Sequence, residues 1–212
     1  MADITFYFPS AGAAPHNCAY SATWQDVTTA VRYPLLTTRG TTDIVSQNCH
    51  KTGTDERGLG GQWVSAALSA RSYTTADTFD FVMPCRDGAG SGTARLWMSI
   101  RVFNAAGDTV IGTLYEGSPN TVLWATSITS RHCDGVAVQN SVDLPENGHI
   151  VVEVGVSDTY GNASFSQNIW PQDLGISGAL PLNDTETSQA MYPWLAFTYG
   201  AASATNVVLN II

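Results

Sequence analysis

The segment from His149 to Ser157 constrains the fold of this chain more than any other stretch. It reads His-Ile-Val-Val-Glu-Val-Gly-Val-Ser, with apolar residues at every second position and Val151 as the one apolar residue among the alternate positions. A period of two, rich in β-branched residues, predicts a β-strand with one buried face. Because one buried face needs a second sheet to cover it, the rest of the chain is expected to supply that sheet.

Similar alternating segments recur along the chain between turn-forming sequences. We predict further strands at residues 3–8, 73–83, 93–104, 109–115, 121–129, 136–144, 163–170, 192–199 and 205–212, with shorter fragments at 35–38 and 42–47. Turn signals spaced roughly every 8 to 12 residues are typical of a β-sandwich or barrel. The length of 212 residues and the wide loops favour an all-β, jelly-roll-like antiparallel β-sandwich with a short N-terminal arm. We expect the strand and arm over residues 1–23 and a single sandwich domain over 24–212.

Other segments are predicted to lie outside the sheets. Residues 28–33 are compatible with one helical turn, although their Thr and Val content lowers helix propensity. Residues 48–61 are polar and glycine-rich, which predicts the most exposed loop in the chain, and they match no nucleotide-binding fingerprint. Residues 131–135 are also predicted as a loop. Residues 171–188 form a polar excursion too long for a tight turn, and such loops often carry function.

The charge pattern excludes several partners. The net charge is −9, and Lys51 is the only lysine, so the basic surface that nucleic-acid binding requires is missing. No run approaches 18 apolar residues, so we expect no membrane partner. The first residues lack the basic and apolar regions of a secretory signal, so we expect synthesis and folding in a cytoplasm.

Cysteine and histidine are the candidate metal ligands of this sequence. In a cytosolic protein the four cysteines are expected to be free, buried thiols. Disulfides and a metal site remain open alternatives, because histidines neighbour three of the cysteines, but no Cys-x-x-Cys pair occurs. The cysteines are Cys18, Cys49, Cys85 and Cys133. No nucleophile elbow, His-Glu-x-x-His or calcium-loop pattern is present, so we expect no enzymatic activity, no catalytic residues, no cofactor and no metal.

Parts of the chain resemble small structural proteins of tailed bacteriophages. The resemblance rests on residues 4–15 (Ile-Thr-Phe-Tyr-Phe-Pro-Ser-Ala-Gly-Ala-Ala-Pro) followed by Trp24, on residues 150–155, and on 184–187 followed by 193–197. Such proteins have jelly-roll-like folds and serve as capsid decoration (cement) proteins, head fibres or tail components, often as trimers. The resemblance implies a virion protein, made in the host cytoplasm, whose partners are its own copies and the major capsid protein or another virion protein.

This resemblance leads to a predicted set of contact residues. We expect an apolar arm and a terminal strand to lie against neighbouring subunits and stabilise the shell. The predicted contacts are Phe6, Phe8, Pro15, Val208 and Ile212. The alternative is a carbohydrate-binding module, or a tail or fibre component that recognises the host surface, using exposed tryptophans and the 171–188 loop.

Overall fold

The computed structural model describes residues 4–39, 46–51, 56–88, 90–158, 165–169 and 193–200. The predicted strand at 205–212 and the 171–188 loop lie outside these residues. The described part of the chain contains thirteen strands and no helix, so nothing in it is long and apolar enough to cross a membrane as a helix. The strands are β1 (Ile4–Tyr7), β2 (Val31–Leu35), β3 (Gln47–Lys51), β4 (Arg57–Ser65), β5 (Arg71–Tyr73), β6 (Thr78–Arg86), β7 (Arg95–Phe103), β8 (Val110–Gly117), β9 (Thr129–Ala137), β10 (Val142–Leu144), β11 (His149–Ser157), β12 (Phe165–Ile169) and β13 (Trp194–Thr198).

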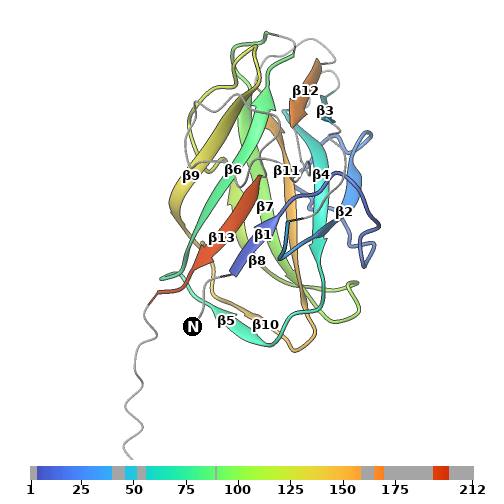
Figure 1. Cartoon of the computed structure of the whole chain (residues 1–212), viewed down its shortest axis with the longest axis vertical. Coiled ribbons are helices and arrows are strands. Elements are labelled where there is room, and N and C mark those ends of the chain that lie inside the picture. Colours follow the sequence, from blue (N-terminus) through green and yellow to red (C-terminus); the bar gives the residue numbers. More distant parts are fainter. Residues whose placement is uncertain are drawn as a thin grey trace, which may run out of the picture.

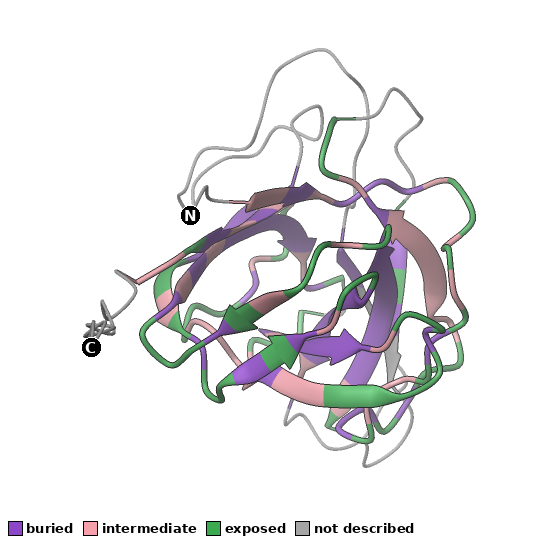
Figure 2. Cartoon of the chain, turned by 90° about the horizontal axis from the view of Figure 1, so that it is seen from below, coloured by how far each residue is buried: buried purple, intermediate pink, exposed green. Residues whose placement is uncertain are grey.

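The strands form two packed sheets, which confirms the predicted jelly-roll-like β-sandwich (Figure 1). One sheet has the order β1-β13-β6-β12-β3, with β9 also pairing with β6. The other has the order β2-β4-β11-β7-β8, and β10 pairs with β5 as a small separate ladder. All pairs are antiparallel except β2 with β4. Viewed from below, both sheets curl around a buried interior (Figure 2).

Strand β11 lies at the centre of its sheet, between β4 and β7, and has the bounds that the sequence predicts. Its alternating apolar residues, from Ile150 to Val156, are fully buried in the core between the sheets. The opposite face was expected to be wet, but Val151 and Glu153 are also fully buried. That expectation was wrong because another part of the chain covers the outer face of this sheet.

The predicted loop at 48–61 is also wrong where the structure describes it, because most of β3 and the start of β4 lie within this segment. The glycines of β4 permit close packing rather than chain reversal. A Cβ on Gly60 would lie 2.7 Å from the Cys49 sulfur, and one on Gly61 would lie 2.6 Å from the Trp63 ring. Glycine inside a strand marks such close approaches, and sequence patterns confuse them with loops.

Other predicted elements need correction. Residues 121–128 form a loop with one isolated bridge at Leu123, and β9 covers the predicted loop at 131–135. The predicted strand at 136–144 is divided between the end of β9 and β10, and the predicted turn at 28–33 contains the start of β2 instead. Strand β12 pairs with β3 and β6. These errors occur in short segments, where local pattern gives way to tertiary pairing.

Backbone and side-chain groups cover several sheet edges. Tyr7 and Leu36 exchange two backbone hydrogen bonds, of 2.7 and 3.1 Å, which join the edges of the two sheets. On the outer edge of β8, the side-chain amide of Gln139 accepts from the Glu116 N–H and donates to the Glu116 carbonyl. Covered edges prevent a foreign strand from adding to a sheet, so contacts there must use side chains.

Candidate assembly surface

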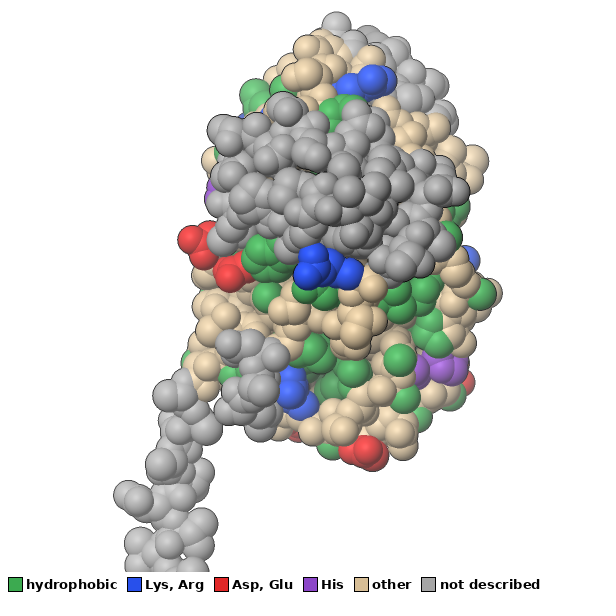
Figure 3. All heavy atoms as spheres, viewed as in Figure 1, with side chains coloured by type: hydrophobic (Ala, Val, Ile, Leu, Met, Phe, Trp, Pro, Cys, Tyr) green, Lys and Arg blue, Asp and Glu red, His purple; other side chains and the backbone are tan. Residues whose placement is uncertain are grey.

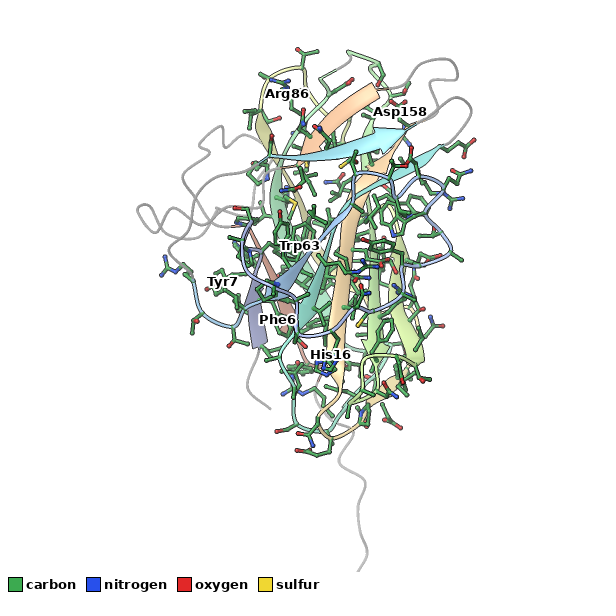
Figure 4. All side chains as sticks on the ribbon, turned by 90° about the vertical axis from the view of Figure 1, so that its right-hand side faces the viewer. Phe6, Tyr7, His16, Trp63, Arg86 and Asp158 are labelled. Carbon is green, nitrogen blue, oxygen red and sulfur yellow. The ribbon has the colours of Figure 1, made fainter. Side chains whose placement is uncertain are left out.

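Residues 9–26 cross the outer face of β4, β11 and β7, and we call this segment the strap. Figure 4 shows this part of the N-terminal ribbon passing in front of β11, with His16 near the lower end of that strand. The strap contains the residues predicted as a free arm, but it packs on its own sheet. Strand β1 likewise belongs to the sandwich, because it pairs with β13. The sequence-based boundary at residue 23 therefore does not separate an arm from the domain.

The carboxylate of Glu153 fixes the strap to the sheet. It accepts hydrogen bonds from the Ser21 N–H at 3.2 Å and from the Trp24 indole N–H at 2.8 Å. Within the sheet it accepts from Gln62 at 2.8 Å and forms an ion pair with Arg101 at 2.6 Å. Arg101 also donates to the strap carbonyl of Ala19 at 2.7 Å. A buried charge is tolerated only when it is paired and hydrogen-bonded, and the Glu153 carboxylate meets both conditions, whereas the buried Nε of Arg101 has no hydrogen-bond partner.

A small apolar cluster lies between the strap and the sheet, separate from the main core. It consists of Cys18, Val64, Phe103 and Val151, all fully buried, with Ala14 packed against them. Burial raises the pKa of the Cys18 thiol, which keeps it protonated at neutral pH. The strap therefore replaces the third layer that the outer face of this sheet would otherwise need.

The strap packs against the β7–β8 hairpin at His16. The His16 ring centroid lies 4.3 Å from that of His149, and a Cβ on Gly107 would come within 2.5 Å of His16. Gly107 has a φ of +70°, so the hairpin turn needs glycine both for its backbone and for this contact. The buried His149 ring is fixed by the carbonyl of Ser65 at 2.8 Å and that of Ala105 at 3.3 Å.

Two large apolar side chains are exposed just after the turn of this hairpin, at the start of β8. Val110 and Ile111 have 42% and 46% of their surface accessible. Val110 lies directly opposite Phe103, so both side chains stand on the strap-covered face of the sheet. Ile111 is the extra residue of a bulge in β8. With the exposed Pro15 of the strap, they form what we call the strap–hairpin surface.

The predicted contact residues differ in where the structure places them. Phe6 and Phe8 are fully buried in the main core, where Phe8 packs edge-on against Trp63, with a centroid distance of 5.2 Å. Figure 4 shows Phe6 and Trp63 between the sheets. The expectation that the two phenylalanines contact a neighbour is therefore wrong for this fold. Pro15 is exposed, and Val208 and Ile212 lie outside the described residues.

Sequence reasoning missed both the strap anchor and the exposed pair. Val110 and Ile111 occur within a correctly predicted strand, and two adjacent apolar residues at the start of a hairpin arm are the signal that could have identified them. Glu153, in an otherwise apolar strand, was treated as a solvent-facing residue. Its partners come from distant positions, so the sequence pattern gives no sign of them.

Among the described residues, structural roles account for the cysteines, the possible metal ligands and the tryptophans. All four cysteines are buried thiols outside any disulfide, which confirms the predicted thiols. The described residues contain no group of three or more His, Cys, Asp or Glu side chains placed to hold a metal ion. None of the five tryptophans in the described ranges is exposed. In Figure 3 the charged side chains appear as small, separate groups.

The fold defines the class of this protein at the level of architecture, as an all-β sandwich. No family model matches the sequence, and no curated protein matches it. A CocE/NonD family hydrolase from Staphylococcus aureus is similar in structure, with a TM-score of 0.48 and 4% identity over 93% of this chain and 37% of the hydrolase. A structure of infectious bursal disease virus gives a TM-score of 0.28 and 11% identity over 90% of this chain and 42% of the viral chain. These likenesses are too weak to support an argument about function.

Proposed function

We propose that this chain is a non-enzymatic structural protein of a tailed-phage virion, and that it decorates and stabilises the capsid as a trimer. The observation that carries this proposal is the strap–hairpin surface. It exposes two adjacent large apolar side chains at the start of β8. Further along β8, the side chain of Gln139 covers the outer edge of the strand. Exposed apolar side chains that adjoin one another favour association between proteins.

Copies of the chain join through this surface in the proposed assembly. Val110 and Ile111 lie beside the strap, whose backbone is held by the buried Glu153 carboxylate. A contact surface that is already rigid loses little conformational entropy on binding. Stable contacts bury roughly 800 Å² per partner, so residues around the apolar pair must also contribute. Repeated copies on a lattice then gain avidity from many contacts.

The carbohydrate-binding alternative receives no support from the described tryptophans, because none offers an exposed ring for stacking. Such a site would depend on Trp170 and the 171–188 loop, which lie outside the described residues.

Occupancy of the virion tests the proposal. Virions would be purified from cells that express the wild-type chain, Ile111→Asp or Leu123→Asp in place of the native copy. Leu123 is the matched control, because it is 41% exposed and bridges Arg95, about 27 Å along β7 from the residue that faces Val110. We expect the wild type and Leu123→Asp to be retained on purified virions and Ile111→Asp to be lost. Equal retention of both variants, or absence of the wild-type chain from virions, would overturn the proposal.

A further inference from the structure

A cavity of about 250 Å³ lies at the base of the sandwich. Figure 1 shows the β5 and β10 segments that border it at the lower end of the molecule. Its apolar wall comes from the side chains of Ile4, Leu68, Ala70 and Leu144, and its polar wall from Ser69, Arg71 and Tyr73. An apolar protein cavity of about 150 Å³ accepts a molecule the size of benzene, so this one has room for a small organic ligand.

The register of the β5–β10 ladder directs an arginine toward this cavity. Arg71 lies opposite Leu144, and Tyr73 lies opposite Val142. Opposed residues share a face, so the arginine stands on the same face as the buried Leu144 and Tyr73. Ser72 and its partner Asp143 occupy the other face, where their side chains share a 2.6 Å hydrogen bond. The nearest acidic residue of the ladder therefore points away from the cavity.

Arg71 has aromatic rather than acidic neighbours. Its guanidinium lies 4.3 Å from the centroid of the Tyr199 ring and donates to the hydroxyl of that tyrosine. Arg71 forms no ion pair with any described residue. The guanidinium has five N–H donors, so several remain for a ligand. Burial raises the pKa of the Tyr73 hydroxyl, which stays protonated at neutral pH.

One carboxylate near the cavity is already engaged. Glu146 accepts a hydrogen bond of 2.8 Å from the backbone N–H of Ala70, at the cavity rim. That contact fixes the rim without pairing the arginine. The cavity thus combines an apolar wall with an inward cation that lacks a charged partner among the described residues.

We propose that this cavity binds a small organic carboxylate, whose carboxylate pairs with Arg71 and whose apolar chain lies against Ile4, Leu68 and Leu144. A planar carboxylate matches the fork of the guanidinium and forms two parallel hydrogen bonds with it. Pockets for small ligands commonly pair apolar walls with a few such polar groups. The site shares no residue with the strap–hairpin surface.

Three ligands test the charged contact and the apolar contact of this proposal separately. They are hexanoate, its neutral analogue hexanamide, and inorganic phosphate. Each would be titrated into the full chain at pH 7.5, with binding followed by methyl NMR signals of Ile4, Leu68 and Leu144. We expect saturable binding of hexanoate, and binding of hexanamide weaker by roughly tenfold, because a charge-assisted pair is lost. Phosphate should bind more weakly than hexanoate because it cannot use the apolar wall.

Substitutions then test whether Arg71 is the cation that pairs with the carboxylate. Arg71→Gln should weaken hexanoate binding by roughly tenfold. Arg95→Gln, at an exposed arginine on β7, should leave it unchanged. Circular dichroism would confirm that both variants are folded, and Leu68→Ala should weaken hexanoate without affecting phosphate. Absence of saturation, equal affinity for hexanamide, equal affinity for phosphate, or an unchanged Arg71→Gln would each overturn the proposal.

Discussion

The indole N–H of Trp24 donates a 2.8 Å hydrogen bond to the carboxylate of Glu153, which is fully buried in the central strand of the sheet. This bond joins the N-terminal strap to a strand more than a hundred residues away in sequence. Because the same carboxylate also pairs with Arg101, the position of the strap is coupled to a buried charge.

Removing that charge should strongly destabilise the protein. Glu153→Gln keeps the shape of the side chain but leaves Arg101 buried without a counter-charge. We expect the free energy of unfolding to fall by about 3 to 5 kcal/mol, measured by urea denaturation. Glu146→Gln is the control, because Glu146 is exposed and contacts one backbone N–H, so its effect should stay below about 1 kcal/mol. A Glu153→Gln protein as stable as this control would contradict the account of the strap.

Loosening the strap should expose one specific thiol. Trp24→Phe removes the hydrogen bond to Glu153, and Cys18 belongs to the same segment and is buried against the sheet. We expect maleimide labelling of Cys18 in the folded protein to accelerate by roughly tenfold, as the loss of a bond worth about 1 to 2 kcal/mol implies. Peptide mass spectrometry identifies the labelled residue. Trp194→Phe, on strand β13 of the other sheet, should leave the rate unchanged, and preferential labelling of Cys49 instead would show that the core, not the strap, had opened.

Gly155 should not tolerate a side chain. A Cβ there would lie 2.2 Å from the carbonyl oxygen of Gly58 and 2.8 Å from the Trp24 ring. Since the backbone of β4 cannot move without breaking its ladder, Gly155→Ala should cost about 2 kcal/mol or more in thermal or urea unfolding. Ser157→Ala, two residues further along the strand, should change stability by less than about 0.5 kcal/mol. Equal stability of the two variants would mean that β11 and β4 are less closely packed than described.

Alkaline pH should destabilise the protein partly through Tyr115. Burial raises the pKa of its hydroxyl to about 12, from about 10 in an unfolded chain. The folded state therefore holds this proton more tightly, and the resulting stability is complete below about pH 10 and is lost as the pH rises toward 12. Between pH 9 and pH 11.5, the free energy of unfolding should fall less for Tyr115→Phe than for the wild type. An equal fall would show that other groups account for the whole effect.

The long strands of this fold are predictable from sequence, and the covering of the outer sheet face is not. Strand β11 has an uninterrupted period of two over nine residues, so local pattern is sufficient to place it. The glycines of β4 occur in a sequence typical of a loop, and their role becomes visible only when the Trp63 ring and Cys49 are placed against them.

The candidate site depends even more on long-range pairing. Phe6 and Phe8 have the composition of an apolar arm, yet β1 pairs with β13, and that pairing turns both rings into the core. Val110 becomes part of a surface patch only because it faces Phe103 beside the strap. Sequence could suggest an apolar N-terminal contact region, but not which of its side chains remain outside.

The solution mass of the purified protein, measured by light scattering after size exclusion, tests most directly whether copies join through the strap–hairpin surface. We predict a wild-type particle of about three times 22.6 kDa, the same mass for Leu123→Asp, and a folded monomer for Ile111→Asp. A wild-type protein that stays monomeric at every concentration, or an Ile111→Asp protein that keeps the trimer mass, would contradict the account.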